Sequence, residues 1–326
     1  MSVARAVLSL DDVRAARRRI DGRLHRTPLL SSRTLSELCG SNVSFKAELF
    51  QRTGSFKPRG VLSKLATLTP DEKERGVISI SAGNHAQALA YAAAVERIDA
   101  LVVMWQTASP MKIAAARGYG ATIDTEAPDI PAAFERLDEL VASTGRTLVH
   151  PYDDPLVIAG QGTVGLEIVE DLPSVDVVLV PVGGGGLVSG IATAVKGMRP
   201  EARVLAIEPE RSRALHESLK AGEPVTVEAA SIADGLNGPY AGANCIRVCL
   251  EQGVESVLVS EDALREAFRF MYGRMKLACE LAGAATAAAL LSGAVDLDGA
   301  RGVAAVVSGG NVAAKTAAAI LAADEA

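Results

Sequence analysis

Short apolar runs alternate with longer stretches of helical composition along most of the chain. The runs that read as buried strands occupy residues 77–80, 100–105, 175–182, 203–207, 254–260 and 302–307. They are followed by stretches with the composition of helices, such as residues 86–97 and 130–144. Continuous apolar strands separated by helices are typical of parallel sheets with crossover helices. The pattern therefore predicts an α/β protein.

The same pattern suggests two domains, one inserted in the other. Residues 150–155 contain two prolines and two aspartates, which is typical of an irregular connection, and a helix is expected only around residues 164–170. We predict a smaller domain over residues 69–152, inserted in a larger domain made of residues 1–68 and 153–326. Each domain is expected to have three layers, with a parallel sheet between helices. At 326 residues the chain is long enough for this arrangement.

The N-terminal part of the larger domain is less regular. A helix is expected to begin near Asp11, and residues 25–29 read as a turn that leads into an edge segment. Residues 44–49 alternate between apolar and polar positions, as a half-buried strand does.

Composition and charge narrow the range of partners. Hydrophobic residues make up 49% of the chain and charged residues 22%, so a folded globular protein is expected. The net charge of −6 argues against a nucleic-acid binder, and we interpret the basic run over residues 14–26 as the solvated face of a helix. The apolar stretches are broken by glycine or charge, and the N-terminus lacks the apolar core of a signal peptide. We therefore expect a cytoplasmic protein that acts on a small molecule, away from membranes.

The cysteines do not indicate a disulfide framework or a metal centre. Cys39, Cys245, Cys249 and Cys279 lack paired metal-ligand spacing, and the chain has only four histidines. We expect buried or idle thiols and no metal site.

A single lysine stands in the glycine-framed segment Gly-Ser-Phe-Lys-Pro-Arg-Gly, residues 54–60. Pro58 lacks a backbone N–H and is tolerated at the first position of a helix, so Lys57 is expected on a turn at a helix start. Partial burial there would favour the neutral amine, which can act as a nucleophile or a base. The functional interpretation is a Schiff-base lysine; the alternative is a surface lysine at the start of a helix.

A run of four glycines follows the most strand-like segment of the chain. The turn that leads from this strand into an alanine-rich helix consists of Gly183, Gly184, Gly185, Gly186 and Leu187. Backbone N–H groups free of side-chain obstruction, at the positive end of a helix, favour a phosphate. The segment matches neither the P-loop nor the usual dinucleotide fingerprint, and the alternative is a tight turn.

A second strand-to-helix turn contains Ser81, Ala82, Gly83, Asn84 and His85. Its N–H groups and hydroxyl suit a carboxylate, and the Asn84 amide suits a polar group on a ligand. Helix capping by Ser81 or Asn84 is the structural alternative, and both roles can hold together.

A third polar turn, beginning at Ser308 and ending at Asn311, follows the last apolar strand. Ligands of open parallel sheets collect beyond the carboxyl ends of the strands. The three turns are therefore expected to face one cleft together with Lys57.

Taken in this order, these segments closely resemble the fold-type II pyridoxal-phosphate enzymes, in particular the threonine/serine dehydratases and their serine racemase relatives. Further matching segments are residues 27–29, 117–121, 150–153, 159–163 and 233–235. The resemblance implies a tryptophan synthase β-like fold and pyridoxal 5'-phosphate as cofactor. It also implies a role for each turn.

By resemblance, Lys57 carries the cofactor as a Schiff base and Phe56 packs beside the cofactor ring. Asn84 would bind the ring hydroxyl and Ser308 the pyridine nitrogen. The segment from Gly183 to Leu187 would bind the phosphate. The turn formed by Ser81, Ala82, Gly83, Asn84 and His85 would bind the carboxylate of the substrate.

The function implied is elimination from L-threonine to give 2-oxobutanoate and ammonia, and from L-serine to give pyruvate. Ala82 stands where serine racemases have a second serine, so racemisation is not favoured. Ala214 stands near the place of an acid that, with the counterpart of Glu208, binds a divalent cation in some relatives, so no such site is expected. The resemblance further implies a homodimer or homotetramer without the C-terminal regulatory domain of the biosynthetic threonine deaminases.

Several alternatives stay open at this level. The substrate could be another β-hydroxy amino acid, such as phenylserine or hydroxyaspartate, and serine racemisation is a further alternative. A non-catalytic amino-acid or cofactor-binding protein could share the fold. A nicotinamide-dependent dehydrogenase is disfavoured by the missing fingerprint.

Overall fold

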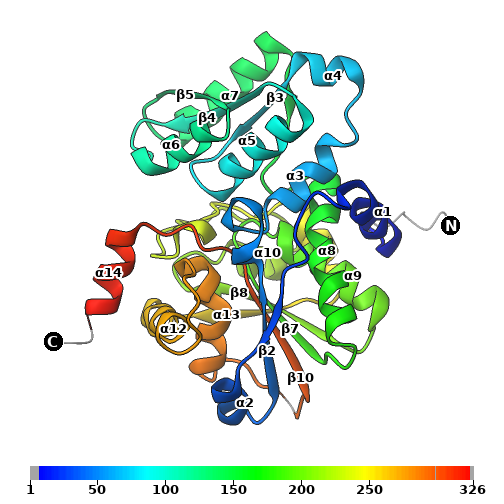
Figure 1. Ribbon diagram of the computed structural model, residues 1–326, viewed down its shortest axis with the longest axis vertical. Helices are drawn as coiled ribbons and strands as arrows, with labels where there is room; N and C mark the ends of the chain where they lie inside the picture. Colours follow the sequence, from blue (N-terminus) through cyan, green and yellow to red (C-terminus); the bar gives the residue numbers. More distant parts are fainter. Residues whose placement is uncertain (1–6, 298, 324–326) are drawn as a thin grey trace.

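The computed structural model describes residues 7–297 and 299–323, and these residues form two lobes, each built on its own sheet (Figure 1). The large lobe contains a six-stranded sheet in the order β1-β2-β10-β7-β8-β9. Its strands are β1 (Leu29–Ser31), β2 (Asn42–Ala47), β7 (Val177–Pro181), β8 (Arg203–Pro209), β9 (Glu255–Val259) and β10 (Gly302–Val307). The pairs are parallel except that β1 runs antiparallel to β2. The prediction of parallel sheets is therefore confirmed with one correction at the edge.

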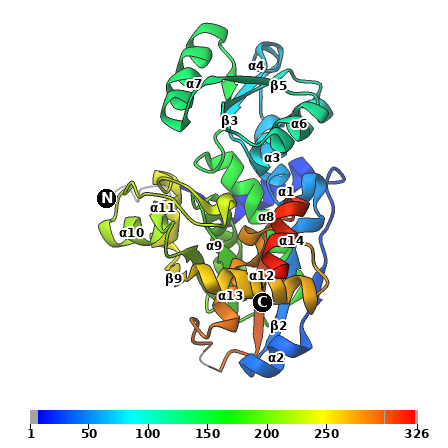
Figure 2. The ribbon, with the colours of Figure 1, turned by 90° about the vertical axis from the view of Figure 1, so that its left-hand side faces the viewer.

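The small lobe contains a four-stranded parallel sheet in the order β5-β4-β3-β6. Its strands are β3 (Val77–Ile80), β4 (Ala100–Trp105), β5 (Thr122–Ala127) and β6 (Thr147–Leu148). All four lie within residues 69–152, and the lobe stands apart from the large one in the perpendicular view as well (Figure 2).

The helices follow the expected alternation with the strands. Those of the large lobe are α1 (Leu10–Ile20), α2 (Arg33–Cys39), α3 (Pro58–Leu65), α8 (Pro155–Asp171), α9 (Gly186–Met198), α10 (Ala214–Ala221), α11 (Ala243–Glu251), α12 (Glu261–Gly273), α13 (Leu281–Leu291) and α14 (Ala314–Ala322). Those of the small lobe are α4 (Pro70–Arg75), α5 (Asn84–Glu96), α6 (Pro110–Gly118) and α7 (Ile130–Thr144). Three short 3-10 helices are η1 (Glu48–Phe50), η2 (Arg52–Gly54) and η3 (Asp234–Leu236).

The large sheet is buried on both faces because its central strands are apolar at every position. Val177 and Leu179 of β7 pack into a core with α12 and α13, whereas Val178 and Val180 pack into a second core with α8 and α9. Side chains that alternate between two faces explain why the run reads as continuously apolar. The result is the predicted three-layer arrangement.

Helix α8 joins the lysine helix α3 to the glycine-loop helix α9 through close contacts between backbones. A Cβ on Gly160 would lie 2.4 Å from the carbonyl oxygen of Arg59, and a Cβ on Gly190 would lie 2.3 Å from that of Ile158. Glycine is required where two helix backbones approach this closely. The contacts fix α3 and α9, and with them the turns that precede both helices.

No helix within residues 7–297 and 299–323 is long and apolar enough to cross a bilayer. All four cysteines are free thiols, and Cys245, Cys249 and Cys279 are buried.

Candidate active site

The residues singled out in the sequence lie together around one cavity of about 700 Å³. Side chains and backbone from both lobes line it. The predicted residues among them are Phe56, Lys57, Ser81, Ala82, Gly83, Asn84, His85, Gly183, Gly184, Gly185, Gly186, Leu187 and Ser308. The cavity thus lies beyond the carboxyl ends of β3, β7 and β10, where ligands of parallel sheets are expected.

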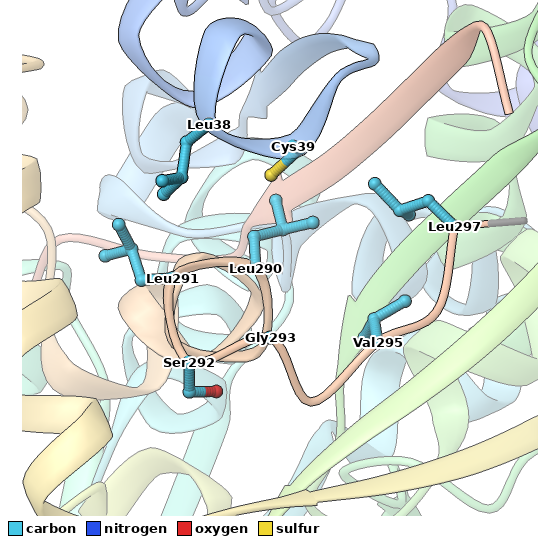
Figure 3. A pocket seen from close by; sticks show the side chains of 8 residues that line it. All are labelled: Leu38, Cys39, Leu290, Leu291, Ser292, Gly293, Val295 and Leu297. Atoms are coloured by element: carbon cyan, nitrogen blue, oxygen red, sulfur yellow. The ribbon is translucent and has the colours of Figure 1, made fainter. Parts of the chain in front are cut away.

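A smaller cavity, of about 370 Å³, lies between the end of α2, the end of α13 and the segment that leads to β10 (Figure 3). Leucine and valine side chains dominate its lining, and Figure 3 shows Leu38, Leu290 and Leu297 around it. Its titratable lining group is the thiol of Cys39, whose pKa is raised by burial. None of the site residues predicted from the sequence lines this smaller cavity, so the larger cavity is the candidate active site.

The lysine turn is attached to the serine turn by backbone hydrogen bonds. The amide of Phe56 donates to the carbonyl of Ser308 over 3.1 Å, and the amide of Gly310 donates to the carbonyl of Gly54 over 2.9 Å. Gly54 has φ +72°, and a Cβ there would lie 2.6 Å from Oδ1 of Asn311. The glycine therefore lets Lys57 and Ser308 meet at one end of the cavity.

The amine of Lys57 faces the cavity under conditions that favour its neutral form. Its Nζ donates to the carbonyl of Pro151 over 2.8 Å and lies 5.1 Å from the centre of the Phe56 ring. Burial lowers the pKa of Lys57 from 10.5 to about 8, against the opposing effects of Cys245 and Glu280. A useful fraction of the amine is therefore unprotonated near neutral pH.

A buried cluster of charges anchors the helix that begins after Lys57. The guanidinium of Arg59 donates to both carboxylate oxygens of Glu48, each over 2.8 Å, and to those of Glu167 over 2.7 and 3.0 Å. Glu167 also pairs with Lys46 over 2.6 Å. Two bidentate pairs in a buried setting restrict the rotation of Arg59. Since Arg59 is two residues from Lys57, the cluster limits the movement of the lysine turn.

The four glycines pack tightly at the start of α9. Gly185 has φ +97°, and a Cβ on Gly184 would lie 2.4 Å from the ring of Tyr152. A Cβ on Gly186 would lie 2.7 Å from the carbonyl oxygen of Tyr152. Gly185 is the N-cap and supplies no side-chain hydrogen bond to the helix. The first amides of α9 are thus left for an anion.

The turn before α5 has a similar construction. Gly83 is the N-cap of α5 and makes no side-chain cap, while the hydroxyl of Ser81 accepts a hydrogen bond from the amide of Gly83 over 3.1 Å. The ring of His85 points its Nε2 into the lobe, 3.1 Å from the carbonyl of Val149 and 3.0 Å from Oγ of Ser79. Burial lowers the pKa of His85 to about 3, so the ring is neutral. The amides of this turn, rather than a charged imidazole, are the groups suited to a carboxylate.

Asn84 lies in a hydrogen-bonded chain that the sequence reasoning did not foresee. Its Nδ2 donates to Oε1 of Glu280 over 2.7 Å, and its Oδ1 accepts from Nδ2 of Asn311 over 2.8 Å. Asn84 belongs to the small lobe, whereas Glu280 and Asn311 belong to the large lobe. Glu280 directly precedes α13 without a turn motif, so neither apolar periodicity nor turn chemistry marks it in the sequence.

Two further groups at the cavity come from outside the three turns. Lys112 of α6 forms an ion pair with Asp234 of η3, which joins the two lobes across the cavity. Tyr152 contacts the ring of Tyr240 edge to face, with ring centres 6.0 Å apart. The segments 150–153 and 233–235 carry part of the resemblance described above, but no periodic pattern of apolar residues marks them.

The sequence model of one family, described as pyridoxal-phosphate dependent enzyme, matches residues 20–309, which is most of the chain. This chain belongs to that family. The resemblance inferred from the three turns is confirmed, and pyridoxal phosphate is the cofactor of the family. Among the described residues, the cavity offers free helix amides for a phosphate, a weakly basic lysine for the aldehyde, and Asn84 and Ser308 for the ring. The residues present therefore fit the cofactor.

Individual members of the pyridoxal-phosphate family are similar to this chain over nearly its full length. L-threonine ammonia-lyase of Thermotoga maritima is 41% identical over 307 residues, which are 94% of this chain and 76% of that protein. The crystal structure of a T.th. threonine deaminase has a TM-score of 0.87 and 43% identity, covering 94% of this chain and 99% of that one. Serine racemase from Dictyostelium discoideum has a TM-score of 0.89 and 36% identity, covering 94% of this chain and all of that one.

Replacing Gly184 with alanine is expected to weaken the binding of pyridoxal phosphate by at least about tenfold. The added Cβ would lie 2.4 Å from the Tyr152 ring, so the ring or the loop before α9 must move. Titration of the purified apoprotein with pyridoxal phosphate, followed by absorbance, measures the change. Gly273→Ala is the matched control because no atom lies within 4 Å of a Cβ at this exposed helical position. Equal affinities of the two variants would contradict the prediction.

The stability of the apoprotein is expected to depend on the protonation of Glu280. Burial raises the pKa of this carboxyl from 4.5 to about 7, although the hydrogen bond from Asn84 opposes the shift. Between pH 4.5 and about 7, the carboxyl of Glu280 is therefore protonated in the folded state but ionised in the unfolded chain. Because a rise in pH favours the state that binds fewer protons, the stability contributed by the protonated carboxyl is complete below pH 4.5 and is lost as the pH rises through about 7. Relative to Glu280→Gln, the unfolding free energy of the wild type should fall by about 3 kcal/mol across this range in urea titrations. A constant difference between the two proteins would show that Glu280 has an ordinary pKa.

Proposed function

We propose that this enzyme is a lyase that converts L-threonine to 2-oxobutanoate and ammonia, and L-serine to pyruvate and ammonia. The observation that carries the proposal is the single cavity that brings the Lys57 amine to the uncapped starts of α5 and α9. One helix start suits a phosphate and the other suits a substrate carboxylate. The threonine-degrading activities in the names of the similar proteins support the same reaction.

Each turn is assigned one part of the cofactor. The amides from Gly183 to Leu187 would bind its phosphate, Ser308 its pyridine nitrogen and Asn84 its ring hydroxyl, while Phe56 packs beside its ring. Bound in this way, pyridoxal phosphate supplies an electron sink that stabilises negative charge at the α-carbon of an amino acid. Ser308 is uncharged and would not enforce protonation of the pyridine nitrogen. Negative charge at the α-carbon would then be stabilised less strongly, which favours elimination.

The chain's own groups bind the substrate and move its α-proton. Lys57 would first hold the cofactor and then, once the substrate amine has replaced it, accept the proton from the α-carbon. Its pKa of about 8 suits this exchange, because the amine can both lose and regain a proton near neutral pH. The turn of Ser81, Ala82, Gly83, Asn84 and His85 would hold the substrate carboxylate through its amides, orienting the α-carbon toward Lys57.

Ala82 separates elimination from racemisation. A racemase needs a proton donor on the face of the α-carbon opposite the lysine, and the methyl group of Ala82 cannot supply one. The side chain at this position therefore supports a lyase over a serine racemase.

The proposal is tested by supplying the purified holoenzyme with a panel of amino acids and measuring 2-oxo acid and ammonia. L-Threonine should give both products in equal amounts, and L-serine should give pyruvate. Faster turnover of phenylserine or hydroxyaspartate would reassign the substrate within the same reaction class. Formation of D-serine without pyruvate would identify a racemase, and binding without any product would indicate a non-catalytic protein.

We also propose that the enzyme acts in the cytoplasm as a homodimer or homotetramer. Free thiols at all four cysteines are expected in a reducing compartment. Large apolar side chains such as Leu38 and Phe50 are at least half exposed, which suits contact with another subunit. Light scattering coupled to size-exclusion chromatography measures the assembly, and a monomer at micromolar concentration would contradict it.

A further inference from the structure

The amide of Asn84 is held in one orientation by groups on both sides. The carbonyl of Thr53 can only accept, and Nδ2 of Asn311 donates to it over 2.7 Å. The same Nδ2 donates over 2.8 Å to Asn84, so the atom of Asn84 on that side must be its oxygen, Oδ1. The nitrogen of Asn84 consequently faces Glu280, to which it donates over 2.7 Å.

The carboxyl of Glu280 fits this place because glycine stands opposite it. A Cβ on Gly309 would lie 2.5 Å from Oε1 of Glu280 and 3.2 Å from Nδ2 of Asn84. The amide of Glu280 also donates to the carbonyl of Gly309 over 3.1 Å. The serine turn after β10 therefore forms one wall of the site that holds the carboxyl.

Glu280 is buried, with 6% of its surface exposed, and lies at the cavity. The charged groups that face it are Lys57, Lys112 and Asp234, contributed by three different segments of the chain. The side-chain nitrogen of Asn84 carries two N–H groups. Among the described residues, one of these groups has a hydrogen-bond partner, the carboxyl of Glu280. The other is left for an acceptor in the cavity, which Asn84 lines.

We infer that Glu280 is a positioning residue that fixes the Asn84 amide so that its second N–H is presented to the ring oxygen of pyridoxal phosphate. Glu280 acts through Asn84, which links the two lobes at the cofactor site. The inference rests on the proposed function, because it concerns how the same site receives the cofactor.

The test compares Glu280→Ala and Glu280→Gln by titrating each apoprotein with pyridoxal phosphate. Alanine removes the acceptor and frees the Asn84 amide to turn, so binding should weaken about tenfold and the visible band should titrate about one pH unit away from the wild-type value. Glutamine keeps an acceptor oxygen and should restore both quantities to near the wild-type values. Glu208→Gln is the matched control, because Glu208 is also buried but its carboxylate accepts from the amides of Leu215 and His216, away from the cavity.

A double-mutant comparison isolates the route through Asn84. If Glu280 acts through Asn84, the variant carrying Asn84→Ala and Glu280→Ala should bind pyridoxal phosphate no more weakly than Asn84→Ala alone. If the two substitutions instead weaken the binding of pyridoxal phosphate independently, so that their fold-losses multiply in the double variant, the inference would be overturned. So would a Glu280→Ala protein with the wild-type affinity and band, or an equal change in Glu208→Gln. A wild-type protein that forms no visible band with pyridoxal phosphate would instead contradict the proposed function.

Discussion

Replacing Lys57 with alanine is expected to lower the turnover of L-threonine by at least about 10³-fold and to remove the visible band formed with pyridoxal phosphate. The amine is the nucleophilic group that lies at the cavity with a lowered pKa, and it also serves as the proposed base. Both functions are lost with the side chain, whereas the helix amides that bind phosphate are retained. Steady-state formation of 2-oxobutanoate and absorbance of the reconstituted protein measure the two effects.

Lys64→Ala is the control, because Lys64 lies on α3, the helix that begins directly after Lys57. Lys64 pairs with Asp154 over 2.8 Å and does not line the cavity, so its loss should leave the band and the turnover close to the wild-type values. Full activity in Lys57→Ala would show that another group is the base and would contradict the role assigned to Lys57.

Replacing Arg59 with alanine is expected to destabilise the folded protein by about 3–5 kcal/mol. Arg59 is 1% exposed, and its removal leaves the carboxylates of Glu48 and Glu167 without their main partner. An unpaired buried charge is unfavourable because water no longer solvates it. Urea unfolding of the apoprotein, followed by circular dichroism, gives the difference in free energy.

Arg33→Ala is the matched control for this experiment. The side chain of Arg33 is 92% exposed and pairs with Glu37 four residues later on α2, a geometry worth about 0.5 kcal/mol or less. Equal losses for the two variants would mean that the buried cluster around Arg59 adds nothing to stability.

Much of the fold could be predicted because the central strands are short, apolar and separated by helices. β3, β4 and β10 have the predicted bounds, since an apolar run that ends at a polar turn marks a buried strand clearly. The strand β1 has three residues and is only partly buried, so its antiparallel pairing left no trace in the pattern.

Helix α8 shows where periodicity stops being informative. It begins at Pro155, capped by the carboxylate of Asp154, whereas a helix was expected only around residues 164–170. Every residue from 157 to 169 is buried, because α3 and α9 pack on this helix together with α1. A helix without an exposed face has no period of 3.6 residues to detect. The two prolines and two aspartates nearby suggested a connection but in fact include the cap and first position of the helix.

The residues of the candidate site also fall into a group that could be predicted from the sequence and a group that could not. The three turns were predictable since each follows a parallel strand, and such strands end at the same edge of their sheet. Glu280, Tyr152 and Lys112 reach the cavity from segments whose position depends on tertiary packing between the lobes. Their contacts at the cavity therefore became visible only with the structure.

The most direct test of the central claim is to reduce the holoenzyme with borohydride and locate the attached cofactor by mass spectrometry of its peptides. Both Lys57 and Lys112 line the cavity, so the mapping discriminates between two amines at the same site. The proposed arrangement predicts modification of the peptide that contains Lys57 and of no other peptide. Modification of Lys112 instead, or no covalent attachment after reduction, would contradict it.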